Sequence, residues 1–87
     1  VVGHGVPAAM TAAVLKVLFL DAAELDPDPG QVVRRVNARF TALGIPDGFA
    51  SLLVVRWCPE QKTAWYASAG HEPGLLTVGS APPVLLE

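Results

Sequence analysis

The sequence predicts an α+β fold in which a pair of helices packs on an antiparallel sheet. Two observations support this prediction. Apolar residues recur at helical spacing through the first half of the chain, and strand-like segments follow the Asp47-Gly48 pair. Proline and glycine residues also divide the sequence into two helices followed by a run of strands. The 87 residues are enough for one small domain with a modest core.

The first helix is expected from Pro7 to about Leu25. Proline fits the first helical position because the N–H that it lacks would have no partner in the helix. The apolar residues of this segment extend around more than one face. They are Met10, Val14, Leu15, Val17, Leu18, Phe19 and Leu20. We therefore expect a helix that is buried on more than one side.

The second helix has clearer boundary signals. Asp28 is expected to cap it, Pro29 suits the first helical position, and Gln31 completes a pattern similar to a capping box. Gly44 and a following proline end the helical pattern. The short proline-rich link between the two helices favours an antiparallel pair.

The second half of the chain is expected to form strands. Residues 49–57 are apolar at alternate and adjacent positions, so both faces of this strand are expected to be covered. A polar turn over 58–62 leads to a partner strand over 63–69, which predicts a hairpin. Residues 74–78 and 84–86 are shorter strand candidates.

Composition and charge exclude several classes of protein. The net charge is −2, and Arg34, Arg35 and Arg39 are interpreted as a solvated helix face, so no nucleic-acid partner is expected. The single cysteine, Cys58, excludes an internal disulfide and indicates a reducing compartment, which predicts a cytoplasmic protein. The apolar run over 14–20 is too short to cross a bilayer, so we expect no membrane contact by this segment.

The apolar content suggests that the chain is part of a larger protein. Hydrophobic residues make up 52% of the sequence and charged residues 16%, which is a high apolar share for so small a chain. We expect surfaces that another segment covers. The first residue, Val1, and the glycine loop that follows it directly favour the same interpretation.

Two glycine motifs are the candidate functional features. Gly3-His4-Gly5 directly precedes the first helix, where unpaired N–H groups and the helix dipole suit an anionic ligand. Gly70-His71 follows the second strand, at a sheet end. A nucleotide-phosphate cradle is a further possibility, but Gly3-His4-Gly5 matches neither the P-loop nor the dinucleotide-binding pattern.

These motifs and three segments between them resemble one family. The segments are Gly3-His4-Gly5-Val6-Pro7-Ala8-Ala9, the Asp28-Pro29 helix entry, Val36-Asn37-Ala38-Arg39-Phe40, Phe49-Ala50-Ser51-Leu52-Leu53 and Ala69-Gly70-His71-Glu72-Pro73. In this order, they are similar to the bacterial PP2C-type (PPM) metal-dependent serine phosphatases of sporulation and the general stress response. Ser51 stands where the family usually has threonine, and Ser68 where it often has asparagine.

The resemblance implies a fold and a reaction. Residues 1–87 would be the central part of one PP2C-like domain, truncated at both ends, with a four-layer α-β-β-α sandwich as the complete fold. Two Mn²⁺ or Mg²⁺ ions would activate a water molecule that hydrolyses phosphoserine on a regulatory protein, an anti-sigma-factor antagonist by family analogy. The parent protein could also carry sensor domains.

The resemblance also implies where the site lies. The backbone carbonyl of Val1 would bind metal, and Gly3, Gly5 and Gly70 would line the site. His4 and His71 are weak catalytic candidates, with structural support of a loop as the alternative role for each. The carboxylate ligands would lie outside this chain, so the isolated chain is expected to be inactive. The competing hypothesis is a catalytically inactive relic or regulatory interaction module that lacks the metal ligands.

Overall fold

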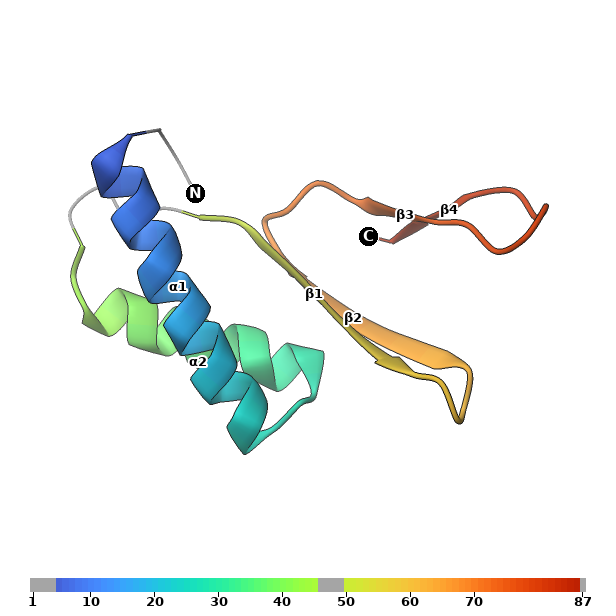
Figure 1. Cartoon of the computed structure of the whole chain (residues 1–87), viewed down its shortest axis with the longest axis horizontal. Helices are drawn as coiled ribbons and strands as arrows, with labels where there is room; N and C mark the ends of the chain where they lie inside the picture. The colour runs from blue at the N-terminus through green and yellow to red at the C-terminus, as the bar shows by residue number, and fades with distance from the viewer. Residues whose placement is uncertain (1–4, 46–49, 87) are drawn as a thin grey trace.

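The computed structural model describes residues 5–45 and 50–86, and it confirms the α+β prediction (Figure 1). The elements are α1 (Val6–Leu25), α2 (Pro29–Ala42), β1 (Leu52–Cys58), β2 (Thr63–Ala69), β3 (Gly74–Leu76) and β4 (Val84–Leu86). The predictions for Val1, Gly3, His4, Asp47 and Phe49 lie outside the described residues.

Helix α1 begins one residue earlier than expected. Gly5 is its N-cap, with φ of 91°, and Pro7 therefore occupies the second helical position. No side chain among the described residues caps this end, and the first backbone hydrogen bond runs from the N–H of Ala9 to the carbonyl oxygen of Gly5 at 3.0 Å. The helix ends at Asp26, whose N–H donates to the carbonyl oxygen of Ala22 at 3.1 Å.

Only one face of α1 is covered in the part of the chain that the structure describes. Ala22 is buried, and Leu15, Leu18 and Phe19 pack against the same core. The opposite face is a stripe of exposed apolar side chains, with exposed fractions between 55% and 72%. Its members are Val6, Met10, Val17 and Leu20. The expected burial on more than one side is therefore wrong for these residues, because α2 packs on one face alone.

The whole of α1, and not only residues 14–20, has to be compared with the length of a membrane-spanning helix. The argument from residues 14–20 considered a short run, whereas the whole 20-residue helix is long and apolar enough to cross a bilayer. Only 6% of its most apolar window is buried. Length and composition do not distinguish a spanning helix from one that another part of a protein covers, so the absence of membrane contact stays a prediction.

Helix α2 begins as predicted, with a modified cap. The Asp28 carboxylate accepts a hydrogen bond from the N–H of Gln31 at 3.1 Å. The N–H of Asp28 donates to the Asp26 carboxylate at 3.0 Å, so Asp26 rather than Gln31 fills the second half of the expected capping box. Gly44 follows the helix with φ of 62°, which confirms the predicted stop.

The two helices and the first hairpin share a small core. Helix α2 runs back across α1 at an oblique angle, so the antiparallel pair is present with its helices crossed (Figure 1). Val32 and Val36 of α2 are buried together with Ala22 of α1 and Val54 of β1. This cluster positions the helix pair on one face of the β1–β2 hairpin.

The β1–β2 hairpin is antiparallel, with Val54 opposite Ala67 and Val55 opposite Tyr66. Side chains alternate between the two faces of a strand, so Val54 contacts the helices while Val55 and Trp57 lie on the other side. Their exposed fractions are 55% and 58%. The prediction that both faces of this strand are covered is therefore wrong within the described residues.

The second hairpin forms a separate ladder. Strands β3 and β4 pair antiparallel, with Gly74 opposite Leu86, and they extend away from the helices (Figure 1). The radius of gyration is 14.7 Å, whereas a compact domain of this length has roughly 12 Å. The expected single sheet is thus two hairpins, of which only the first supports the helix pair.

Candidate functional site

The turn after β2 depends on the backbone freedom of glycine. Gly70 has φ of 67°, a conformation that side chains of L-residues rarely adopt. A Cβ atom at this position would meet no atom within 4 Å. The backbone angle, rather than lack of space, therefore explains glycine at this position of the predicted Ala69-Gly70-His71 turn.

His71 makes hydrogen bonds to the local backbone. Its Nδ1 atom lies 2.8 Å from the carbonyl oxygen of Glu72, which can only accept, so Nδ1 carries the proton. The Ser68 hydroxyl donates to the carbonyl oxygen of His71 at 3.5 Å. These contacts hold the turn together, and the described residues offer no hydrogen-bond partner to Nε2 of the exposed His71 ring.

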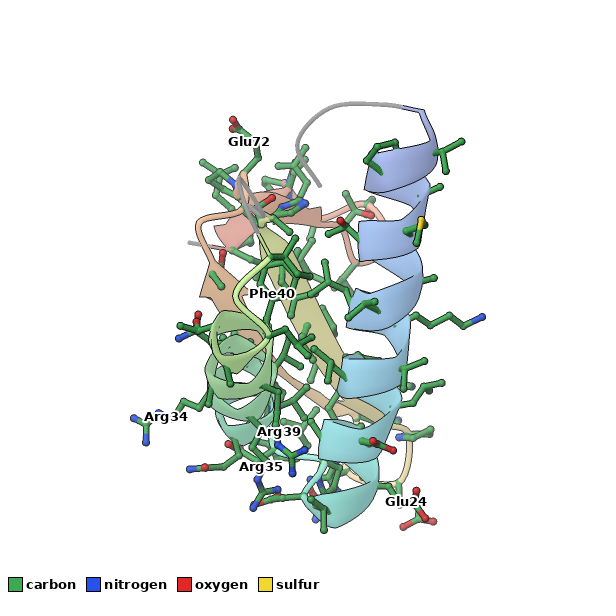
Figure 2. All side chains as sticks on the ribbon, turned by 90° about the vertical axis from the view of Figure 1, so that its left-hand side faces the viewer. Glu24, Arg34, Arg35, Arg39, Phe40 and Glu72 are labelled. Carbon is green, nitrogen blue, oxygen red and sulfur yellow. The ribbon has the colours of Figure 1, made fainter. Side chains whose placement is uncertain are left out.

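The N-terminal end of α1 lies at the same end of the molecule as this turn (Figures 1 and 2). Figure 2 shows Glu72, from the turn, and the start of α1 at the top of the view. The first N–H groups of a helix have no partner within it and carry partial positive charge. Gly5 has no side chain of its own to cap α1, and an anion is the type of ligand that such N–H groups favour.

Residues from three of the sequence motifs line one cavity, where the helix pair packs on the first hairpin. A cavity of about 80 Å³ lies between α1, α2 and the start of β1. Asn37 and Phe40 line it from the second helix, Ser51 and Leu52 from the first strand segment, and Ala69 from β2. Most of the lining is apolar, so the packing of helix pair on hairpin accounts for these motif positions.

The described residues do not fit a two-metal centre by themselves. They contain no group of three or more His, Cys, Asp or Glu side chains that could hold a metal ion. Asp21 and Glu24 lie near the C-terminal end of α1, opposite the glycine entry, and Asp26 and Asp28 serve the connection to α2. The prediction that the carboxylate ligands stand outside this chain remains a prediction.

Some of the remaining residues lie where the sequence predicts them, and others do not. Cys58 is free and half-buried, in agreement with an incidental thiol. Among the aromatic residues, Phe19 packs on the core as expected, whereas Trp57 is largely exposed. Arg35 departs most from its prediction: instead of lying on a solvated face, it lines a cavity between the two helices.

Comparison with known proteins agrees with the fold and with the glycine motifs. The model of the family described as stage II sporulation protein E (SpoIIE) matches residues 1–86. The chain is also 30% identical over 74 residues to the phosphoserine phosphatase RsbU of Bacillus subtilis (strain 168). That match covers 85% of this chain and 22% of RsbU, so the chain spans about a fifth of its relative's length. No solved structure matches the chain.

These observations show that the chain is a segment of a phosphatase-family protein. It folds as a helix pair packed on an antiparallel hairpin. The chain belongs to the SpoIIE family. The resemblance to the sporulation and stress-response group of PP2C-type phosphatases, drawn from the motifs, is thereby confirmed.

Proposed function

We propose that this chain is part of a phosphatase domain that hydrolyses phosphoserine on a regulatory protein. The family match over residues 1–86 carries the proposal, and the name of the relative RsbU gives the type of reaction. The glycine turn at Gly70 and the glycine entry to α1 support it, because both lie at one end of the molecule and both expose backbone groups.

The described residues would contribute scaffold and charge rather than a nucleophile. The free N–H groups at the start of α1 would attract the oxygen atoms of a phosphoryl group. The turn from Ser68 to Glu72 would hold a loop at the same end of the molecule, where the His71 side chain is exposed. Divalent Mn²⁺ or Mg²⁺ would supply an activated water, with carboxylate ligands from outside this chain.

The experiment uses the full-length protein that contains this chain. Phosphate release from a phosphorylated anti-sigma-factor antagonist is measured with and without Mn²⁺. The family resemblance implies that one of the carboxylate ligands is an aspartate directly before Val1. We expect Mn²⁺-stimulated activity, which is lost when that aspartate is replaced by asparagine. Activity that survives this replacement would show that the metal assignment is wrong.

A second candidate function is that of a regulatory module without metal. The absence of a three-ligand cluster among residues 5–45 and 50–86 favours it. Titration calorimetry of the full-length protein with Mn²⁺ separates the two hypotheses, because the phosphatase proposal places the carboxylate ligands outside this chain. Saturable binding by the full-length protein would count against the regulatory module, and no heat of binding would count against the phosphatase proposal.

A further inference from the structure

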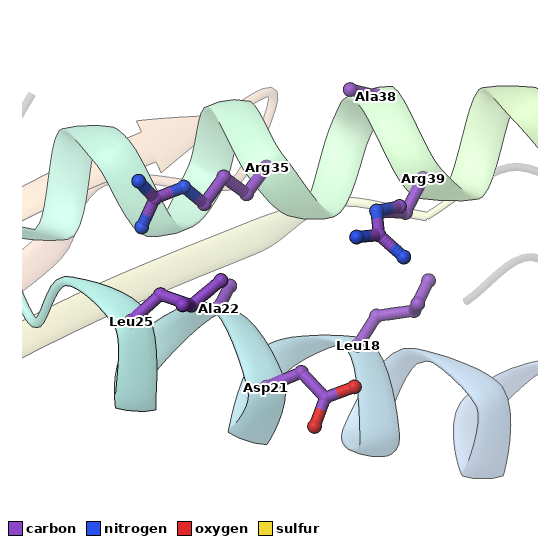
Figure 3. Close-up of a pocket in the computed structure, with 7 residues that line it drawn as sticks. All are labelled: Leu18, Asp21, Ala22, Leu25, Arg35, Ala38 and Arg39. Atoms are coloured by element: carbon purple, nitrogen blue, oxygen red, sulfur yellow. The ribbon is translucent and has the colours of Figure 1, made fainter.

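A cavity of about 160 Å³ lies between α1 and α2, near the C-terminal end of α1 (Figure 3). We call it the helix-end cleft. Four of its seven lining residues are aliphatic and three are charged. They are Leu18, Ala22, Leu25 and Ala38, and Asp21, Arg35 and Arg39.

The cleft is separate from the proposed phosphatase site. Asp21 stands 16 residues beyond Gly5 on α1, which corresponds to about 24 Å along the helix axis. The glycine turn after β2 lies at the Gly5 end of the molecule (Figures 1 and 2). A ligand in the cleft would therefore not reach the reacting groups.

Two guanidinium groups enter the cleft from α2. Arg35 and Arg39 are four residues apart, so their side chains leave the same face of the helix. Figure 2 shows both beside α1, while Arg34 points away from it. Helix α2 contains no acidic residue, so Asp21 of α1 is the one negative charge among the residues that line the cleft.

One nitrogen of the Arg35 guanidinium group is buried without a hydrogen-bond partner in the described part of the chain. The Nη1 atom of Arg35 is buried and has no hydrogen-bond partner among the described residues. A buried N–H of a charged group without an acceptor costs free energy, which a suitable acceptor would recover. Because Arg35 also lines the cleft, its guanidinium group lies at the cleft wall with part of its hydrogen-bonding capacity unused.

Asp21 is the natural internal candidate for that acceptor, and the structure does not use it. Its carboxylate lines the cleft but points away from both guanidinium groups (Figure 3). No salt bridge joins Asp21 to Arg35 or Arg39 in the described part of the chain. With two positive charges and one negative charge, the cleft has a net charge of about +1 at neutral pH.

We propose that the helix-end cleft binds one carboxylate side chain of an acidic segment of a partner protein. A single carboxylate matches the local net charge, and the two guanidinium groups suit its planar oxygen pair. The aliphatic floor of Leu18, Ala22 and Leu25 suits the methylene stem of a glutamate. Leu25, which is 71% exposed, extends the apolar surface beside the cleft for the rest of the segment.

A macromolecular partner is favoured over a free small anion because the cleft is open and small. One ion pair at such a site offsets little of the entropy that a small molecule loses on binding. A segment that also covers the neighbouring leucines gains apolar burial as well. The proposal is independent of the phosphatase reaction, since it concerns the opposite end of α1.

The cleft chemistry is tested by NMR titration of the full chain with isocaproate, which has an apolar stem and one carboxylate. Isocaproamide is the neutral control, and inorganic phosphate and phosphatidylserine vesicles are the comparison anions. We expect saturable shifts at Leu18, Leu25 and the Nε–H of Arg35 with isocaproate alone. Equal binding of isocaproamide, tighter binding of phosphate or selective binding to vesicles would overturn the proposal.

Matched variants locate the site. Arg35→Gln should weaken isocaproate binding by roughly tenfold or more, since it removes a charged donor. Arg34→Gln removes the same charge from the adjacent exposed position and should change little. Asp21→Asn should strengthen binding, because it removes a like charge from the wall. An equal loss in the Arg34 and Arg35 variants would show diffuse attraction and refute a specific cleft.

The partner segment is tested with two short amphipathic peptides that differ only in a central glutamate or glutamine. The glutamate peptide should bind the unaltered chain at least about tenfold more tightly, which corresponds to the loss of a charged hydrogen bond. Because this comparison alters only the ligand, it stays valid if Arg35→Gln fails to fold. Equal affinity of the two peptides would refute the acidic-segment proposal.

Discussion

The stereochemistry of one alanine at position 70 tests the candidate turn directly. Gly70 has φ of 67°, and no atom lies within 4 Å of the place that a Cβ atom would occupy there. L-alanine would be forced into the left-handed region, at a cost of about 1–2 kcal/mol. D-alanine prefers that region.

Both alanines also restrict the unfolded chain relative to glycine, which stabilises the folded state by about 0.4–1 kcal/mol. L-alanine should therefore lower the free energy of unfolding by up to about 1.6 kcal/mol. D-alanine should raise it by about 0.4–1 kcal/mol. The difference between the two variants does not depend on hydrophobicity, since they have the same composition.

The assay is urea unfolding of the two chemically synthesised chains, followed by far-UV circular dichroism. With a slope of about 1 kcal/mol per molar urea, the midpoints should differ by about 1 M or more. D-alanine at position 12, an exposed position within α1, is the control and should destabilise the chain. If L-alanine at position 70 is as stable as D-alanine, the left-handed turn is refuted.

The other predictions concern the elements that carry the site. Asp28→Ala should cost about 1 kcal/mol of stability in urea unfolding, because it removes the acceptor for the first turn of α2. Val32→Ala should cost about 2 kcal/mol, since Val32 is only 1% exposed, whereas Val17→Ala should cost much less. The guanidinium carbon of Arg56 lies 5.6 Å from the centroid of the Trp65 ring. Arg56→Gln removes this cation–π contact, so it should cost about 0.5–1 kcal/mol of stability and change the wavelength of tryptophan fluorescence. No change in either the stability or the emission would contradict that contact.

Local signals in the sequence were sufficient for the helices and the first hairpin. Asp28 and Pro29 define the start of α2 through backbone hydrogen bonding, and the structure reproduces that start. A run of apolar residues located β1, and the polar turn over 58–62 placed β2 as its hairpin partner. The reciprocal half of the cap was not predictable, since Asp26 and Gln31 compete for the same N–H of Asp28 and only geometry decides between them.

The position of Arg35 could not be predicted, for a different reason. Arg34 and Arg35 are adjacent and identical in type, and neither composition nor spacing shows which one faces α1. The crossing of the helices decides it, because that crossing directs Arg35 toward Leu25 and leaves Arg34 in solvent. Long-range packing also determines which face of β1 is covered, so Val55 and Val54 have opposite environments despite equal hydrophobicity.

The exposed area explains why the candidate site and the core are both incomplete. The accessible surface is 6540 Å², whereas a compact monomer of 9.1 kDa exposes roughly 4,900 Å². The excess of about 1,600 Å² equals the whole area that a standard protein–protein interface buries. Much of it is apolar, on the outer stripe of α1 and beside Trp57. Covering these surfaces would stabilise the helix pair whose N-terminal end carries the glycine entry, so stability and the geometry of the phosphatase end should depend on the same contacts.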